Sequence, residues 1–519
     1  MMQTTNDVRS TENDAGGFLG HPRGLSTLFF TELWERFSYY GMKAFLVVFV
    51  VASAQSEGGL GFDKEKASAL ISIYFSVAYL TGLPGGWIAD KFLGQRRAVF
   101  WGGVIIMFGH ISLAFHSLAT FYLGLLLIIC GTGLLKTNVS ALVGQLYKPG
   151  DIRRDAGYSI YYMGINIGAF VGPLIGGWLA QSVTFKKFLS DNGMDPNNSW
   201  HWGFGSAAVG MFFGLLQFVL GSKRLGNAGL KVKEESTPEA ERKNWFTLWT
   251  SIAALVIIVG IGAAIHNMNI YEITIHRLSD LVGLTLIGLP IVCFGMILMS
   301  SEYTTDEKKK VGALACLYFI SMVFFTGLEQ GSSTLNLFAA EKTQCSIFGY
   351  EFPSSWFQSL NPLFVVTLAP IFAAIWVRMG EKQPSSPGKF IISMFFVFIA
   401  FVIMGFAAKA SVAAGPGARV SPLWLTVVFL FITFAELCIS PIGLSLVTKL
   451  APQRCVGLIM GVWWIANASA GYLAGKSIHL TEKYSESQVY FGTAVFALGS
   501  GILLALLSKP IKKMMGGVS

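Results

Sequence analysis

The chain has 519 residues, of which 53% are hydrophobic and 13% are charged, and its mean hydropathy is +0.57. Soluble proteins carry about 25% charged residues, so this composition excludes a string of soluble domains. The net charge of +9 comes from Lys and Arg residues dispersed between apolar runs, which argues against nucleic-acid binding. Apolar runs of about 20 residues recur, the length that crosses a bilayer as a helix. The sequence therefore predicts a polytopic, all-α membrane protein.

Apolar runs are separated by charged or Gly/Pro breaks, and in chain order they give fourteen predicted membrane spans. Residues 1–23 precede them; they are polar and lack a signal peptide, so we expect a disordered cytoplasmic tail. The predicted spans cover about 25–54, 67–90, 98–117, 119–147, 157–182, 202–222, 246–265, 281–301, 311–340, 355–379, 389–409, 422–449, 456–477 and 488–508.

The first six and the last six spans are nearly equal in total length, 197 and 198 residues. Two equal six-helix halves predict the major facilitator plan of parallel repeats around a central site. The predicted organisation is a tail (1–23), a six-helix bundle (24–222), a connecting region with two extra spans (223–310), a second six-helix bundle (311–508) and a cytoplasmic tail (509–519).

The distribution of basic residues predicts the orientation of the chain. With both termini inside, 25 of the 38 Lys and Arg residues fall in inside segments and 10 fall in outside segments. Because cytoplasmic loops carry an excess of Lys and Arg, this bias favours two cytoplasmic termini.

Seven ionisable residues lie deep in apolar runs, where each costs at least about 2.5–3.5 kcal/mol on insertion scales. We therefore expect them to face a cavity and to find partners there. They are Glu32, Glu35, Arg36 and Lys43 in the first span, Lys136 in the fourth, Glu329 in the seventh and Glu436 in the tenth.

The first span places its polar groups on one helical face. At about 100° per residue, the four ionisable side chains of this span and Tyr39 fall within a stripe 100° wide on the helix surface. Leu33 and Phe37 point elsewhere. The alternative is a salt-bridged seam that only joins helices. Apolar packing would do that without desolvating five polar groups, so we favour a functional stripe.

Other polar residues lie at helical spacing or beside prolines. Tyr158, Tyr162 and Asn166 form a row in the fifth span, and Glu329, Ser333 and Asn336 share a predicted face of the seventh. Two assignments stay open. Asn361 precedes Pro362 and could instead satisfy a backbone group freed by the proline, and Trp463 and Trp464 could be interfacial anchors or pocket walls.

Several of these segments resemble the proton-dependent oligopeptide transporter (POT) family of the major facilitator superfamily. The motif ExxERFxYYG is complete from Glu32 to Gly41, GGWIADKFLGQRRAV runs from Gly85 to Val99, and YxxYYMGINIGAF runs from Tyr158 to Phe170. Shorter blocks begin at Glu329, Gln358 and Glu436, and the resemblance extends from about residue 24 to 508. Bacterial members of the family also have two extra helices between the six-helix halves.

The resemblance implies roles for individual residues. Glu32, Glu35, Arg36, Lys136 and Glu329 match proton-coupling positions. Positions of the peptide pocket are matched by Arg36, Tyr39, Lys43, Tyr79, Lys136, Asn166, Asn361, Glu436, Ser440 and Trp463. Two features depart from the family: Lys43 stands where many members have arginine, and the second span lacks the histidine of animal members. Coupling should therefore rest on carboxylates.

We therefore expect a symporter of di- and tripeptides with protons in the cytoplasmic membrane, working by alternating access. Cations in the N-terminal half would bind the peptide carboxylate, and Glu436 would bind its ammonium group. The six cysteines show no CxxC spacing, and we expect no metal, cofactor, nucleic acid or obligate protein partner.

Three alternatives remain open. A nitrate or other small-anion symporter is disfavoured by Glu436, since an anion gains nothing from a carboxylate. An intramembrane enzyme is disfavoured because HExxH, GxSxG and a phosphate-binding loop are missing. Composition alone does not exclude a membrane receptor or channel.

Overall fold

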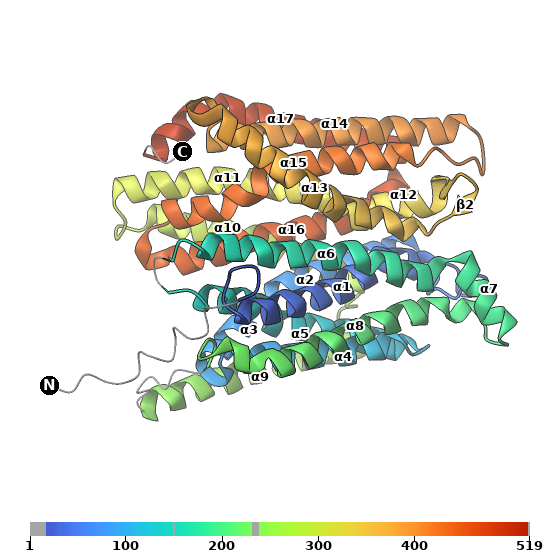
Figure 1. Ribbon diagram of the computed structural model, residues 1–519, viewed down its shortest axis with the longest axis horizontal. Helices are drawn as coiled ribbons and strands as arrows, with labels where there is room; N and C mark the ends of the chain where they lie inside the picture. The colour runs from blue at the N-terminus through green and yellow to red at the C-terminus, as the bar shows by residue number, and fades with distance from the viewer. Residues whose placement is uncertain (1–16, 149–150, 231–237, 517–519) are drawn as a thin grey trace.

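The computed structural model describes residues 17–148, 151–230 and 238–516, and it is almost entirely helical (Figure 1). The N-terminal half contains α1 (Gly24–Val51), α2 (Lys64–Leu80), α3 (Gly82–Ile88), the π-helix η1 (Ala89–Leu93), α4 (Gln95–Leu113), α5 (Leu118–Gln145), α6 (Arg154–Gln181), α7 (Val183–Asp191), η2 (Pro196–Asn198), α8 (Ser199–Gly221) and η3 (Ser222–Leu225). The connecting region contains α9 (Pro238–Asn267) and α10 (Ile275–Met299).

The C-terminal half has the same kind of architecture. It contains α11 (Thr305–Glu329), η4 (Gln330–Ser332), α12 (Thr334–Lys342), β1 (Ser346–Ile347), β2 (Tyr350–Glu351), η5 (Ser354–Ser359), α13 (Leu360–Met379), η6 (Gly380–Lys382), α14 (Ser386–Ala413), α15 (Leu423–Leu450), η7 (Gln453–Cys455), α16 (Val456–Lys483) and α17 (Glu486–Met514). The two short strands form an antiparallel hairpin in which Ser346 pairs with Glu351.

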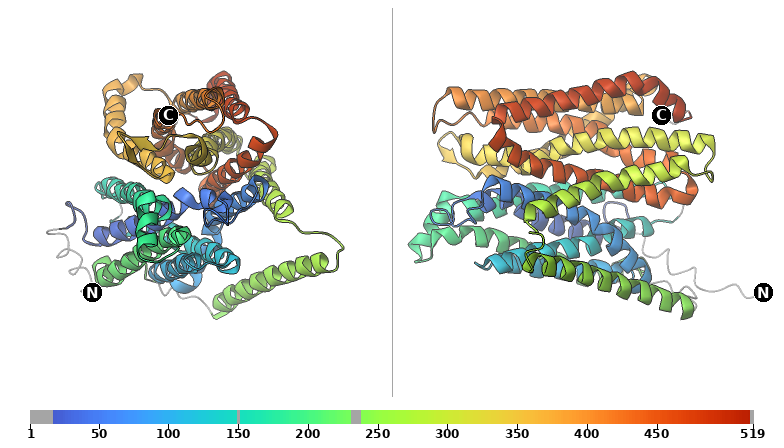
Figure 2. Two further views of the ribbon diagram at one scale, coloured as in Figure 1. Left: turned by 90° about the vertical axis from the view of Figure 1, so that its right-hand side faces the viewer. Right: turned by 180° about the vertical axis from the view of Figure 1, so that it is seen from behind.

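The two halves lie side by side as separate helical bundles, and each has its own apolar core (Figures 1 and 2). The first helix begins and the last helix ends at the same end of the molecule, which we call the termini end (Figure 1). The opposite end, where α7 and the β-hairpin lie, is called the far end. Figure 2 also shows α9 standing apart from α10, and the apolar stretch of α9 has no buried residue.

Within the described residues, twelve helical segments are long and apolar enough to cross a membrane. This number includes α2, α3 and η1 as one segment, and it includes both α9 and α10. Two further long helices, α1 and α4, are outside this set. Four ionisable residues lie in α1, and α4 begins with Gln95 followed by Arg96 and Arg97.

Close packing of α1 on α6 sets the position of the charged stripe. Gly164, Gly168 and Gly172 follow one face of α6, and a Cβ atom at Gly168 would clash with the carbonyl oxygen of Leu33. Small residues let two helix backbones approach closely inside a membrane. The glycine row therefore brings α1 against α6, and this packing fixes the direction in which Arg36 points.

Serine side chains join the halves along α2 and α16. Ser68, Ser72 and Ser76 recur every four residues on α2, and each donates a hydrogen bond to a backbone carbonyl of α16. The accepting oxygens belong to Gly475, Tyr472 and Ala468, at 2.9, 3.1 and 3.1 Å. Such bonds between membrane helices contribute about 0.6 kcal/mol each on average.

A second seam between the halves lies where α6 meets η5. The indole of Trp356 donates to the carbonyl of Leu174 at 3.0 Å, and the hydroxyl of Ser359 donates to that of Phe170 at 2.7 Å. In the part of the chain that the structure describes, the hydrogen bonds and ion pairs between the halves lie from the middle of the molecule to the far end. The halves are therefore sealed at the far end.

The structure differs from the sequence-based prediction at several helix boundaries. The expected continuous second span (67–90) breaks at Thr81, and the expected seventh span breaks at η4. The last helix continues to Met514 instead of ending at 508. Residues 17–23 are held against the bundle, because Phe18 packs on Phe29 and His21 lies 3.0 Å from the hydroxyl of Tyr147; disorder is wrong for these residues. The rest of the predicted N-terminal tail, 1–16, lies outside the described residues.

Candidate functional site

A central cavity of about 550 Å³ lies between the two halves. Helices α1, α2, α5 and α6 line it on one side, and α11, α13, α15 and α16 line it on the other. Of the thirteen residues that the sequence singled out, eleven line this cavity: Glu32, Arg36, Lys43, Tyr79, Lys136, Asn166, Glu329, Asn361, Glu436, Ser440 and Trp463. Glu35 and Tyr39 are buried beside the cavity and are not part of its lining.

Arg36 is the centre of a buried charged cluster on α1. Its Nε atom lies 3.0 Å from Glu32 Oε1 and also contacts Glu35 Oε2, and all three side chains are at most 4% exposed. Glu32 and Arg36 line the central cavity, whereas Glu35 does not. Arg36 Nη2 and Glu32 Oε2 have no hydrogen-bond partner among the described residues. The cluster therefore keeps unused hydrogen-bonding capacity in a buried position.

An ion pair between Lys43 and Glu329 connects the two halves inside the cavity. Lys43 Nζ lies 2.6 Å from Glu329 Oε2, and both residues are buried. In this structure Glu329 pairs with Lys43 and not with Lys136, the other cation that the sequence placed among the coupling residues. Glu329 is the last residue of α11, directly before the η4 break, and this position directs its carboxylate toward α1.

Lys136 is a half-buried residue that has no ion-pair partner among the described residues. Its Nζ lies 4.1 Å from the centre of the Tyr79 ring, a cation–π contact. A cation–π contact with an aromatic ring stabilises an ammonium group less than an ion pair with a carboxylate does. Lys136 is therefore a cation in the cavity wall that is free to bind an anionic group.

On the other side of the cavity, Glu436 is a carboxylate whose hydrogen-bond partner among the described residues is a neutral amide. Asn361 Nδ2 donates to Glu436 Oε2 at 2.9 Å and lies 3.1 Å from the hydroxyl of Thr433. Asn361 thus uses its amide group on side chains of α15, so its position in the structure does not depend on a backbone group freed by Pro362. Trp463 and Trp464 both line the cavity as wall residues.

Several polar lining residues were not identified from the sequence, among them Tyr40, Thr132 and Asn467. Each of these three lies four residues from an expected lining residue, namely Arg36, Lys136 and Trp463. Helical spacing of i and i+4 places such pairs on one face, so that signal could have identified them. Ser333 shows the opposite outcome. The η4 break turns it away from the face of Glu329, and it does not line the cavity.

The two halves contribute charged residues of opposite sign to the central cavity. Its described cations, Arg36, Lys43 and Lys136, all belong to the N-terminal half, whereas Glu329 and Glu436 belong to the C-terminal half. Glu32 reduces the positive charge of the N-terminal side, and Lys43 and Glu329 neutralise each other. Lys136 and Glu436 remain as opposite charges without an ionic partner among the described residues. This arrangement suits a small molecule that carries both an anionic and a cationic group.

Two membrane-spanning bundles around a charged central cavity, sealed at one end, define a membrane transporter. A profile of the POT family matches residues 96–495 of the chain. The chain is 36% identical to the Peptide transporter YePEPT of Yersinia enterocolitica, over 98% of this chain and 98% of that protein. It is 35% identical to a Di-/tripeptide transporter of Lactococcus lactis, over the full length of both chains.

A similar structure, described as peptide transporter POT in complex with sulfate, has a TM-score of 0.87 and 39% sequence identity to this chain. The match covers 98% of this chain and 99% of that one. The chain belongs to the POT family. It is a transporter and not an enzyme, and it is a multi-pass protein of the cytoplasmic membrane, as the sequence predicted.

Proposed function

We propose that this chain transports di- and tripeptides together with protons by alternating access. The observation that carries the proposal is the placement of Lys136 and Glu436 on opposite halves of one cavity, with no ionic partner for either among the described residues. Every short peptide has a terminal carboxylate, a terminal ammonium group and amide groups. A site that accepts many side chains must bind these shared groups.

In the proposed complex, Lys136 and the free Nη2 of Arg36 bind the peptide carboxylate. Glu436 accepts hydrogen bonds from the ammonium group, and the Asn166 side chain pairs with the backbone amides. Tyr79 and Trp463 form walls against which side chains of different shapes can pack. A peptide bound in this way contacts both halves, so its binding favours the state in which they close around it.

Proton coupling is proposed to act through the same charged groups. A proton on Glu329 removes the attraction to Lys43 and thereby weakens the connection between the halves. On α1, a peptide carboxylate that competes for Arg36 frees Glu32 or Glu35 to take a proton. Proton loading and peptide binding then depend on each other because they share cations.

We further infer that α1 and α4 also cross the membrane, which gives fourteen spans with both termini in the cytoplasm. The excess of basic residues in the predicted inside segments supports this orientation. The start of α1 and the end of α17 lie at one end of the bundle, which also supports it. With this orientation, the seal at the far end makes the structure closed to the outside. A fluorescent-protein fusion after Ser519 should then fluoresce, whereas an alkaline phosphatase fusion there should be inactive.

Uptake into proteoliposomes tests the proposed function. We expect an imposed inward proton gradient to drive accumulation of a labelled dipeptide, and unlabelled di- and tripeptides to compete. Tetrapeptides, free amino acids and nitrate should compete weakly. Competition by nitrate alone would identify a small-anion symporter, and equilibration without accumulation would identify a channel.

A further inference from the structure

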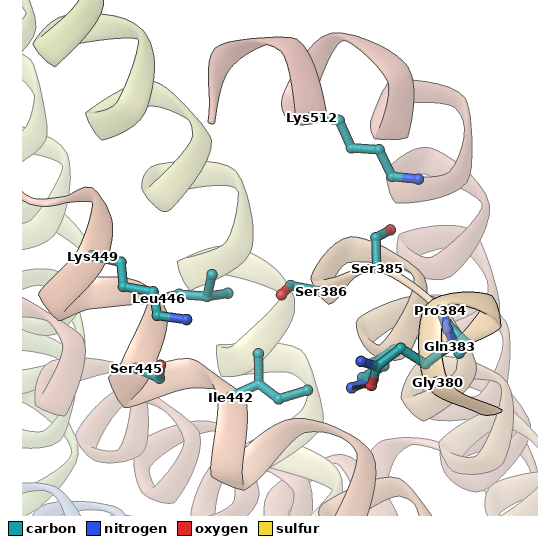
Figure 3. A pocket seen from close by; sticks show the side chains of 11 residues that line it. Gly380, Gln383, Pro384, Ser385, Ser386, Ile442, Ser445, Leu446, Lys449 and Lys512 are labelled. Atoms are coloured by element: carbon teal, nitrogen blue, oxygen red, sulfur yellow. Dashed lines mark hydrogen bonds between the residues drawn. The ribbon is translucent and has the colours of Figure 1, made fainter. Parts of the chain in front are cut away.

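A second cavity, of about 570 Å³, lies in the C-terminal half, and Figure 3 shows side chains that line it. It is at the termini end and shares no lining residue with the central cavity. It is formed by the turn between α13 and α14, the last turns of α15 and the end of α17. None of its lining residues belongs to the set that the proposed transport mechanism uses.

The second cavity is strongly cationic. Lys389, Lys449 and Lys512 line it, and none of its eleven described lining residues is acidic. Within the described part of the chain, none of these lysines forms an ion pair; Lys389 donates to Gln383 Oε1 at 3.1 Å and lies 4.8 Å from the ring of Trp376. Three ammonium groups around one open cavity repel each other unless an anion lies between them.

Polar groups of α14 face the same cavity. Ser386 is only 5% exposed, yet its hydroxyl has no hydrogen-bond partner among the described residues. In Figure 3, Lys449 lies at the left and Ser386 faces it near the centre. Ser385 lies above and to the right of Ser386, and Lys512 lies at the top. Ser385 precedes a helix of 28 residues and does not cap it with its side chain. Pro387 has no N–H, so the first turn of this helix offers the N–H groups of Ser386 and Gly388 and a positive dipole end to an anion.

The equivalent corner of the N-terminal half is already filled by the chain. Counting helices within each half, the turn before α4 corresponds to the turn before α14. There, Arg96 Nε donates to the carbonyl of Ala228 at 2.5 Å, and the N–H of Gly229 donates to Gln145 Oε1 at 2.8 Å. Segment 226–229 thus satisfies the polar groups of that corner. No described segment does the same for Lys449 and Ser386, and the side chain of Lys389 hydrogen-bonds only to Gln383 among the described residues.

We propose that the second cavity is a binding site for a phosphate group, carried by an anionic phospholipid or by a soluble phosphate ester. Three lysines, a buried hydroxyl and a helix N-terminus provide the donors that a phosphate accepts. The cavity lies where helices of the C-terminal half end, at the level at which lipid headgroups would be expected. Occupation of the site would hold α14, α15 and α17 together at this end.

The test measures lipid binding to the purified full-length protein by native mass spectrometry. The probes are dioleoyl phosphatidylglycerol and dioleoyl phosphatidylcholine, each with and without glycerol 3-phosphate as competitor. The test variant is Lys389→Gln/Lys449→Gln/Lys512→Gln. The control is Lys223→Gln/Lys509→Gln/Lys513→Gln, which removes the same charge from exposed positions outside the cavity.

We expect phosphatidylglycerol to bind the wild type and the control at least about tenfold more tightly than the triple cavity variant, since each basic residue near an anionic surface contributes about 1 kcal/mol. Competition by glycerol 3-phosphate would identify a soluble ester as the ligand, and its absence would identify the lipid. Equal losses of phosphatidylglycerol binding in both triple variants would overturn the proposal. Equal binding of phosphatidylglycerol and phosphatidylcholine to the wild type, without competition by glycerol 3-phosphate, would also overturn it. Ser386→Ala, expected to weaken binding about threefold, provides the same test if the triple variant does not fold.

Discussion

Lys43 Nζ lies 2.6 Å from Glu329 Oε2, so the first helix of one half is tied to the end of α11 in the other half at the depth of the central cavity. Removing one partner of a buried ion pair costs about 3–5 kcal/mol, because the remaining charge is left without compensation. This pair is therefore a major contact between the halves.

The charge swap Lys43→Glu/Glu329→Lys should restore much of the thermal stability that either single substitution removes, because the ion pair is re-formed in reverse. Melting temperatures of the purified variants measure this. The matched control is Lys136→Glu/Glu329→Lys. If that second swap recovered stability and the first did not, the partner of Glu329 would be Lys136.

The serine row on α2 should set the balance between the two access states. Ser68→Ala/Ser72→Ala/Ser76→Ala removes three hydrogen bonds to α16, worth about 0.6 kcal/mol each. We expect a shift of roughly tenfold or more toward the state open at the far end, measured by spin-label distances across that end. Ser206→Ala is the control, since Ser206 bonds within its own helix. An equal shift in the control variant would show that the serine row on α2 has no special effect on the two access states.

Glu32→Gln and Glu35→Gln mimic permanently protonated carboxyl groups beside Arg36. Each variant should lose proton-driven accumulation but keep peptide-for-peptide counterflow, because exchange needs no net proton movement. One electrical charge through 100 mV is worth about 2.3 kcal/mol, several tens-fold in accumulation. Both assays are run in the same proteoliposomes. If both variants still accumulated peptide, Glu329 would become the candidate proton carrier.

Lys136→Gln should weaken binding of peptides with a free carboxylate by about 10- to 100-fold, the value of a hydrogen bond to a charged group. A dipeptide amide should lose much less, because it has no carboxylate for Lys136 to bind. Competition against a labelled peptide measures both ligands. Equal losses would show that the substrate carboxylate does not lie at Lys136.

Much of this architecture could be predicted from the sequence, since long apolar runs and the helical phase of the charged residues are local properties. The phase of α1 placed Glu32, Arg36 and Lys43 on one face, and all three line the central cavity. Helical phase does not specify which neighbouring helix a face meets, and so the partner of Glu329 could not be predicted.

Helix breaks were the other feature that sequence periodicity did not predict. The expected face containing Glu329, Ser333 and Asn336 assumes a continuous helix, whereas the η4 break leaves Ser333 off that face and Asn336 donating to the carbonyl of Ala44. Such breaks in a membrane are stable only where other groups satisfy the freed backbone atoms, which depends on tertiary packing.

The most direct test of the account is a binding measurement on Glu436→Gln with two ligands, a free dipeptide and its N-acetylated form. Among the described residues, the hydrogen-bond partner of Glu436 is the neutral amide of Asn361, and we propose that Glu436 binds the peptide ammonium group. Affinity for the free dipeptide should fall about 10- to 100-fold, whereas affinity for the N-acetylated dipeptide should hardly change. Equal losses for both ligands would contradict the proposal that the peptide binds between Lys136 and Glu436.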